Sequence, residues 1–219
     1  MISKILAVGD SFTYGEELLD RSKSWPQLVA DNLGASLDNK AAPGTGNTRI
    51  VRNLVESAAN ELDLVLIGWS SAGRIEFADD EGIFDTWPGY SGRMFSTHHN
   101  WRNALIEYVS CFHSPEYLYK QFLINVILAQ NFLESKKIRY LMINTVNNEF
   151  YRNQYANKFT DLESQINRSS FVGWGKFGMV ELADKFPKGP NGHFLDTGHE
   201  VVANVITAAV KQKGWDKWQ

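Results

Sequence analysis

The chain has 219 residues, and the 43% that are hydrophobic can build the core of one sizeable domain. A net charge of −3 gives no basic excess of the kind that binds nucleic acid or an anionic membrane. Cys111 is the only cysteine, which excludes an intrachain disulfide. No apolar run approaches the ~20 residues of a membrane span, and the N-terminal run is too short for a signal peptide. We therefore expect a single domain over residues 1–219, a cytoplasmic location and no membrane span.

Strand and helix patterns alternate from the N-terminus. An apolar run over residues 4–8 predicts a short buried strand. Residues 25–33 have helical spacing and are followed by Gly34, which is typical of a helix C-cap. Residues 36–39 form a weaker strand pattern, so the chain begins with a β-α-β order.

A loop, a second helix and a third strand follow. Residues 41–48 contain Pro and Gly in a composition typical of a loop, and Asn47 or Thr48 could cap the next helix. Residues 62–67 are rich in Leu, Val and Ile, as a buried parallel strand should be. The helix between them is expected to bury one face, made of Ile50, Leu54, Val55 and Ala58.

Regular periodicity is absent from residues 68–99 and mixed over residues 147–190. A loop as long as the first of these is usually functional inside a compact domain. Elsewhere the pattern predicts helices over residues 101–108, 116–133 and 196–211 and a fourth strand over residues 138–144.

This alternation predicts an α/β fold, a three-layer α/β/α sandwich around a mostly parallel sheet. Right-handed crossovers place the carboxyl ends of the first three strands side by side. Ser11 and the loops at residues 43–46 and 68–71 then converge at that edge, where open α/β sheets bind their ligands.

The most informative motif is Gly-Asp-Ser-Phe-Thr-Tyr-Gly over residues 9–15, directly after the first strand. Together with the blocks described next, it resembles the nucleophile block of the SGNH/GDSL hydrolases. That family has a flavodoxin-like three-layer fold and cleaves esters. The resemblance implies that Ser11 is the nucleophile, and we expect Asp10 to hold the nucleophile loop through backbone hydrogen bonds.

The second block of the family is an Asn, a small residue and a glycine whose N–H faces the oxyanion. Asn39, Ala41 and Gly44 match that spacing, and Gly46 is a second candidate. A backbone donor must come within ~3 Å of the developing charge, and a side chain there would obstruct it. The alternative is that both glycines only shape the turn.

The third block departs from the family pattern Gly-x-Asn-Asp, because this chain has Gly68-Trp69-Ser70-Ser71. Ser70 stands where the family has the Asn that donates to the oxyanion. A hydroxyl is shorter than an amide and rotates freely, and losing an oxyanion donor costs ~3 kcal/mol of transition-state stabilisation. Three possibilities stay open: Ser70 donates, Asn47 reaches in, or activity is low.

The fourth block offers two histidines. Asp196-Thr197-Gly198-His199 fits the family motif Asp-x-x-His literally. Family members usually carry a second Gly-His five and six residues after the catalytic histidine, inside the last helix. That spacing favours His193 as the base, with His199 as the helix residue and Asp196 as the N-cap of the helix.

This alignment leaves the acid of the triad unassigned. The family's acid position, three residues before His193, is occupied by Pro190, which cannot serve. Asn191 is close and could accept from the imidazole Nδ1–H, although an amide does not stabilise imidazolium as a carboxylate does. We expect a Ser-His dyad, supported by Asn191 or by an acid that the sequence does not identify.

Candidate substrate contacts follow the third strand. The aromatic residues between Trp69 and Tyr119 either pack in the core or form a wall for a sugar or an acyl chain. Trp69 and Arg74 are the candidate substrate-binding residues, and Arg74 could equally pair with Glu76.

A candidate metal site lies in the same long segment, at His98 and His99 with Asp79, Asp80 and Asp85 nearby. The spacing of these residues is irregular for metal ligands, which favours a solvated loop. We expect neither a metal nor a cofactor.

Together the blocks imply a serine esterase that forms an acyl-enzyme, with oxyanion contacts from Ser11, Gly44 and Ser70. The long aromatic and acidic segment favours a small-molecule or glycan ester, first of all an O-acetyl group on a carbohydrate. The alternative is an SGNH-fold glycan-binding module whose catalysis is weak or lost.

Overall fold

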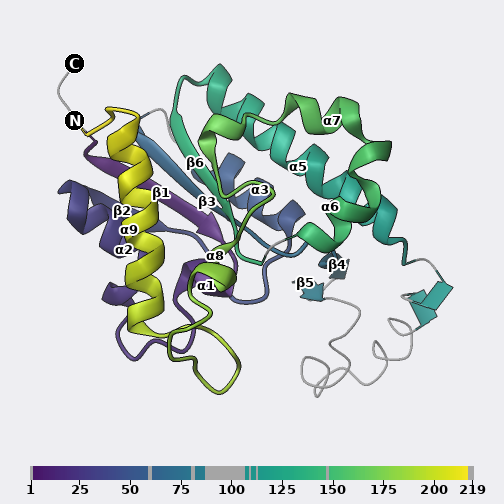
Figure 1. The fold of residues 1–219 in the computed structure, drawn as a ribbon, viewed down its shortest axis with the longest axis horizontal. Helices are drawn as coiled ribbons and strands as arrows, with labels where there is room; N and C mark the ends of the chain where they lie inside the picture. Colours follow the sequence, from purple (N-terminus) through teal and green to yellow (C-terminus); the bar gives the residue numbers. More distant parts are fainter. Residues whose placement is uncertain are drawn as a thin grey trace.

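The computed structural model describes residues 2–58, 61–79, 82–86, 107–108, 110–111, 113–146 and 148–216. Its centre is a five-stranded sheet in the order β2-β1-β3-β6-β7, in which every neighbouring pair is parallel (Figure 1). The predicted α/β fold with a flavodoxin-like strand order is therefore confirmed. The strands are β1 (Lys4–Gly9), β2 (Ser36–Asn39), β3 (Leu64–Trp69), β6 (Arg139–Asn144) and β7 (Phe171–Val172).

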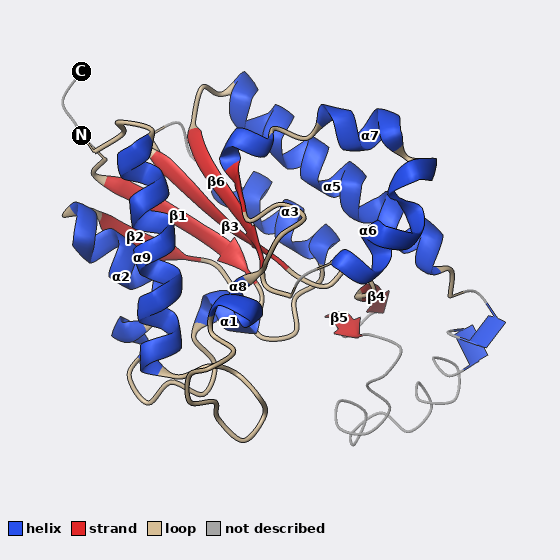
Figure 2. Ribbon diagram, in the orientation of Figure 1, coloured by secondary structure: helices blue, strands red, loops and turns tan. Residues whose placement is uncertain are grey.

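Helices cover both faces of this sheet, which makes the three layers that the sequence predicts (Figure 2). On one face α2 contacts α9, and on the other face α3 contacts α5. These helices span Trp25–Leu33 (α2), Asn47–Ser57 (α3), Pro115–Ser135 (α5) and Asp196–Gln212 (α9).

The core is divided by the sheet into two clusters, because successive side chains of a strand point to opposite faces. Ile5 and Ala7 of β1 belong to the cluster under α2 and α9. Leu6 and Val8 belong to the cluster under α3 and α5. Since β1 has an apolar cluster on each face of the sheet, its residues 5–8 are all hydrophobic, and the strand reads in the sequence as a continuous apolar run.

The smaller elements connect and cover the main layers. Residues 75–86, expected to be irregular, contain an antiparallel hairpin, β4 (Ile75–Asp79) with β5 (Gly82–Thr86), so that expectation is wrong there. Short 3-10 segments cover Arg21–Lys23, Ala156–Lys158 and Arg168–Ser170. The short helices are α1 (Ser11–Tyr14), α6 (Glu149–Tyr155), α7 (Thr160–Gln165) and α8 (Met179–Leu182).

Two expectations about α3 are corrected. Its N-cap is Gly46, because the side chain of Asn47 is turned toward the third block and Thr48 lies inside the helix. Val55 is 49% exposed rather than inward, since it lies one residue, or about 100° of helical rotation, beyond the buried Leu54. The helix expected over residues 101–108 lies largely outside the described residues.

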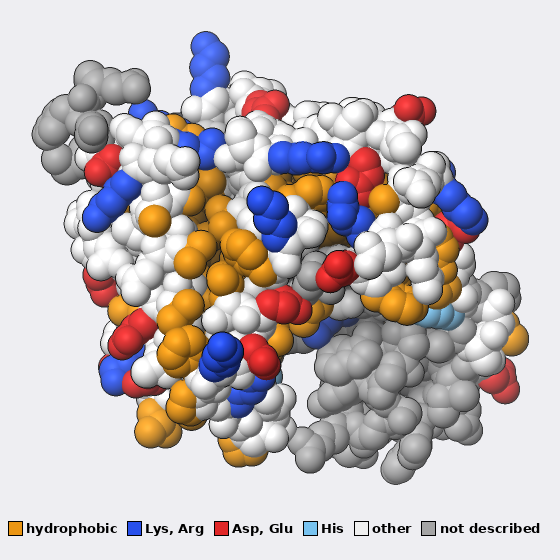
Figure 3. Space-filling model, in the orientation of Figure 1, with side chains coloured by type: hydrophobic (Ala, Val, Ile, Leu, Met, Phe, Trp, Pro, Cys, Tyr) orange, Lys and Arg blue, Asp and Glu red, His pale blue; other side chains and the backbone are white. Residues whose placement is uncertain are grey.

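The surface carries charged side chains of both signs (Figure 3), in line with the small net charge of the chain. Lysine, arginine and acidic side chains are interspersed over the face drawn in Figure 3. Among the helices of the described ranges, none has the length and apolar character needed to cross a membrane.

Candidate active site

Ser11 stands at the carboxyl end of β1, as the first residue of the one-turn helix α1. Asp10 is the N-cap of this turn, and its Oδ1 accepts from the Phe12 N–H at 3.1 Å and from the Thr145 hydroxyl at 3.0 Å. Burial raises the pKa of the Asp10 carboxyl above its usual range, while the nearby charge of Arg74 opposes that rise. The carboxyl group thus ties the turn at Ser11 to the residue after β6, Thr145.

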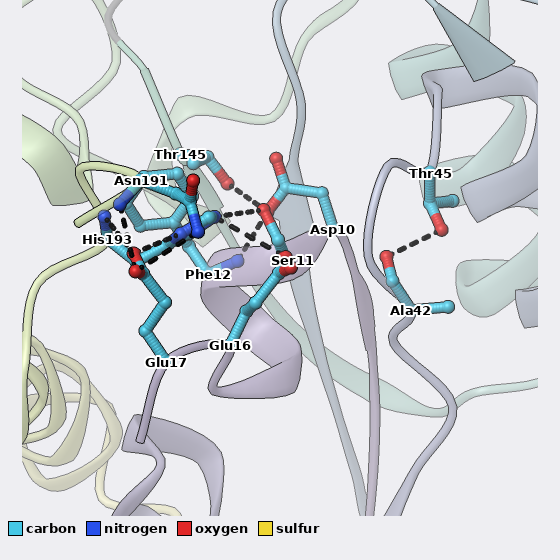
Figure 4. A network of polar contacts seen from close by, with 10 residues as sticks. All are labelled: Asp10, Ser11, Phe12, Glu16, Glu17, Ala42, Thr45, Thr145, Asn191 and His193. Atoms are coloured by element: carbon cyan, nitrogen blue, oxygen red, sulfur yellow. Dashed lines mark hydrogen bonds and ion pairs between the residues drawn. The ribbon is translucent and has the colours of Figure 1, made fainter. Parts of the chain in front are cut away.

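His193 contacts Ser11 from the loop that precedes α9. The distance from its Nε2 to the Ser11 Oγ is 2.9 Å (Figure 4). The ring of Phe12 packs on the imidazole with 4.6 Å between ring centroids, and the ring of Phe12 packs in turn on Phe194 at 5.1 Å. The imidazole is therefore held between the nucleophile turn and the start of the last helix.

The residue that orients His193 is Glu17, which the sequence reasoning does not identify. Its Oε2 lies 2.9 Å from the imidazole Nδ1, and the backbone N–H of His193 donates to the same oxygen at 3.1 Å. An ionised carboxylate only accepts hydrogen bonds, so Nδ1 carries the proton. In the neutral ring, Nε2 is then free to accept the proton of Ser11.

Asn191 has a different role from the expected one, which is a correction. Its backbone N–H and its amide donate to Oε1 of Glu17, at 2.8 Å and 3.2 Å, instead of accepting from the imidazole. Burial pushes the pKa of Glu17 upward, but the hydrogen bonds from Asn191 and His193 outweigh it and hold the pKa below its usual range. Glu17 is thereby kept ionised beside the imidazole.

The loop that carries these donors closes tightly on Glu17. A Cβ atom on Gly189 would lie 2.6 Å from the carboxyl carbon of Glu17, so a larger residue there would displace this carboxylate. Glu17 itself has a positive φ of 67°, an uncommon conformation for glutamate. The only signal in the sequence was an acidic pair directly after Gly15, which the family alignment does not mark.

His199 has a different environment from His193. It is 1% exposed, its Nδ1 accepts from the backbone N–H of Trp25 at 3.1 Å, and burial lowers its pKa to about 3. The expected N-cap role of Asp196 is wrong: the N-cap of α9 is Leu195, and the Asp196 carboxylate pairs with Lys23 at 2.5 Å. Asp196 is the first residue inside the helix, where its negative charge is stabilised by the partial positive charge of the helix N-terminus.

Ser11 and Gly44, two of the residues expected to bind an oxyanion, have backbone N–H groups without a hydrogen-bond acceptor among the described residues. Gly44 has a φ of +81°, which favours glycine in this turn. Asn39 joins the first two blocks, since its side chain donates to the Thr13 carbonyl and accepts from the Ala41 N–H.

The third block is held by hydrogen bonds to its backbone. Asn47 accepts from the Ser70 N–H at 3.0 Å and donates to the Ser71 carbonyl at 3.0 Å, so its amide is engaged and does not reach the nucleophile. The Ser70 hydroxyl is fully buried near the Asp10 carboxyl and, within the described ranges, makes no hydrogen bond of ordinary geometry. In this arrangement the hydroxyl presents no surface to a substrate oxygen.

Trp69 is not a substrate-binding residue in this structure, which corrects the sequence interpretation. Its side chain is completely buried under α5 and packs edge-to-face on Phe122 with 6.2 Å between ring centroids. The reason is the strand alternation, because Trp69 follows Val65 and Ile67 on the same face of β3.

Arg74 lines a cavity of about 300 Å³ beside the third block, together with Asn47, Gln121 and Asn125. Asn125 is a buried residue of α5 whose side chain lines this cavity. The Glu76 carboxylate, a possible partner of Arg74, is bound by Arg52 through contacts of 3.0 Å and 2.9 Å.

His98, His99 and Asp80 of the candidate metal site lie outside the described residues. Among the residues that are described, no group of three or more His, Cys, Asp or Glu side chains is arranged to hold a metal ion.

Solved structures show which fold this is. TesA matches with a TM-score of 0.60 at 14% identity, over 96% of this chain and 99% of that one. A lipolytic protein of the G-D-S-L family from Desulfitobacterium hafniense DCB-2, described as putative, matches at 0.56 and 13%, over 94% and 99%. A family two carbohydrate esterase from Clostridium thermocellum, in complex with cellohexaose, matches at 0.56 and 18%, over 97% and 65%. The identities are low, so the likeness shows the SGNH hydrolase fold alone.

Sequence comparison gives a family but no activity. No curated protein matches this sequence significantly. The model of one family, described as a family of unknown function, matches residues 14–216, which is most of the chain. The chain, with its SGNH hydrolase fold, therefore belongs to the family of unknown function DUF6071.

Proposed function

We propose that this protein is a serine hydrolase of carboxylic esters, with Ser11 as nucleophile, His193 as base and Glu17 as acid. The observation that carries the proposal is the relay of two 2.9 Å contacts, from Ser11 Oγ to Nε2 and from Nδ1 to Glu17. A nucleophile within hydrogen-bond reach of a base that a third group orients is the geometry of covalent acyl transfer.

In the proposed mechanism, Nε2 of His193 takes the proton of Ser11 while Oγ forms a bond to the ester carbonyl carbon. The carbonyl oxygen becomes an oxyanion that accepts from the N–H groups of Ser11 and Gly44. His193 then protonates the leaving alcohol as the C–O bond breaks, which leaves an acyl-Ser11 ester. A water molecule, deprotonated by His193, attacks this ester and releases the acid, and Ser11 regains its proton.

Glu17 supports hydrolysis over the alternative of a glycan-binding module. Its carboxylate stabilises the imidazolium that forms after proton transfer, and binding alone does not require such a group. The altered third block leaves the proposed oxyanion site with one donor fewer than the family pattern, because the Ser70 hydroxyl is buried. Two backbone donors remain in the proposal, at Ser11 and Gly44.

A hydroxylated substrate, with an O-acetyl group on a carbohydrate as the first candidate, is the finer part of the proposal. The cavity beside the third block supports it, because the amide side chains of Gln121 and Asn125 line it and suit sugar hydroxyls. The similar fold of the carbohydrate esterase that was solved with cellohexaose is consistent with this choice.

The reaction is tested with p-nitrophenyl acetate and with a fluorophosphonate probe that labels activated serines. We expect turnover and a single adduct on Ser11 in the wild type, and neither in Ser11→Ala. Ser135→Ala, an exposed serine at the end of α5, is the matched control and keeps both. A folded wild-type protein without turnover or adduct would favour the binding module. Acetate release from acetylated xylan tests the finer substrate: p-nitrophenyl acetate turnover without it would contradict the carbohydrate assignment.

A further inference from the structure

A second carboxylate lies beside the catalytic pair, and the proposed mechanism does not use it. Glu16 Oε2 is 3.5 Å from His193 Nε2, the same nitrogen that contacts Ser11 (Figure 4). The side chain of Glu16 is 37% exposed, whereas that of Glu17 is 10% exposed. The turn places it there, since the backbone N–H of Glu16 donates to the Ser11 carbonyl at 3.0 Å.

The other carboxylates around the nucleophile are compensated by neighbouring groups. Glu17 accepts hydrogen bonds from Asn191 and His193. Asp10 is buried and faces the charge of Arg74.

Glu16 is the exception. Of the described residues, only His193 comes within ion-pair distance of its carboxylate. Its charge is therefore open to whatever binds at Ser11.

We infer that Glu16 sets the charge specificity of the site: it disfavours esters with an anionic acyl group and favours those with a cationic one. This inference rests on the proposed esterase function. His193 Nε2 lies 2.9 Å from Ser11 Oγ and 3.5 Å from Glu16 Oε2, so a charge on an acyl group at Ser11 lies on the order of 6 Å from Glu16. At that distance, with an effective dielectric constant of about 40, one unit charge changes kcat/KM about tenfold.

The test compares three p-nitrophenyl esters of similar acyl length: the neutral butyrate, the anionic hemisuccinate and the cationic 4-(trimethylammonio)butyrate. For the wild type we expect kcat/KM to be highest for the cationic ester and lowest for the anionic one. In Glu16→Gln, we expect the ratio of anionic to neutral ester to rise about tenfold and the ratio of cationic to neutral ester to fall about tenfold. Because the Debye length falls to about 3 Å at 1 M ionic strength, high salt should bring both ratios closer to one in the wild type.

Glu61→Gln is the matched control, since it makes the same charge change at an exposed residue just before β3, at the opposite end of the sheet. It should leave both ratios unchanged. Turnover with equal ratios in the wild type and in Glu16→Gln would overturn the charge role of Glu16 and leave the esterase intact. A wild type that hydrolyses none of the three esters would overturn the proposed function, and this inference with it.

Discussion

His193 and His199 lie six residues apart on the two sides of Phe194, yet they have opposite environments. The imidazole of His193 is 12% exposed and lies between Ser11 and Glu17, with Glu16 close by. His199 is 1% exposed, packs edge-to-face on Phe194 and receives one backbone hydrogen bond.

The contrast shows that the histidine of the literal Asp-x-x-His motif is a different residue from the histidine that has the contacts of a base. The literal Asp-x-x-His spacing ends on His199, which burial holds in the neutral form with a pKa of about 3. An imidazole with a pKa that far below neutral is a weak proton acceptor at neutral pH, where an efficient general base has a pKa near the working pH. The groups that a base needs, a nucleophile on one nitrogen and an acceptor on the other, surround His193 instead.

The largest expected effect separates the two histidines directly. His193→Ala should lower kcat for p-nitrophenyl acetate by about 10⁶-fold, because the proton of Ser11 then has no acceptor. His199→Asn should retain turnover, since its Oδ1 can replace Nδ1 as the acceptor for the Trp25 N–H. A folded His199→Asn protein that has lost activity, beside an active His193→Ala protein, would reverse the assignment.

The next effect concerns the acid. Glu17→Gln should lower kcat by about 10⁴-fold while the fold is retained, because an amide can present its NH₂ group to Nδ1 and favour the wrong tautomer. Asn191→Ala removes one of the donors to Glu17 and is the milder companion variant. Steady-state kinetics with one ester is sufficient, and unchanged kcat in Glu17→Gln would mean that the acid is elsewhere.

We expect the buried His199 to affect the pH dependence of the protein's stability rather than its activity. Below about pH 6.5 the unfolded chain protonates His199, while the folded protein does not until the pH nears 3, so stability falls as the pH drops through this window. Between pH 7 and pH 5 the loss at this site is about 2 kcal/mol. Urea unfolding of the wild type and of His199→Asn at both pH values isolates it, and equal losses in the two proteins would contradict the buried neutral state.

A smaller effect is expected from the aromatic contact on His193. Phe12→Leu keeps an apolar side chain but removes the ring that packs on the imidazole at 4.6 Å. We expect kcat to fall about tenfold through poorer orientation of the base, with little change in KM. A loss of thermal stability without a change in kcat would assign Phe12 to packing alone.

The smallest effect is expected at Ser70, and it tests whether the third block contributes to the reaction at His193. Ser70→Ala should change kcat by less than about threefold, because the hydroxyl has no surface open to a substrate; loss of a working oxyanion donor costs about 10²–10³-fold. A loss in the larger range would show that Ser70 turns toward the substrate during the reaction.

Most of the fold could be read from the sequence, because the decisive signals are local. Apolar runs of strand length, helical spacing and Gly34 predict the order of the main elements, and alternation along β1 and β3 explains the two core clusters. The hairpin at residues 75–86 was missed because its strands contain polar residues and lie outside the main sheet.

The sequence by itself determined the α/β order, the position of Ser11 at a strand end and the preference for His193 over His199. Only the tertiary structure indicated Glu17 as the acid of the proposed triad, since the loop of residues 189–193 must close on the turn after Ser11 before Glu17 can reach Nδ1. It likewise placed Trp69 in the core and Glu16 beside the nucleophile. The physical reason is range: strand and helix patterns depend on near neighbours, whereas a carboxylate becomes an acid or a specificity group through contacts made by chain closure over 176 positions.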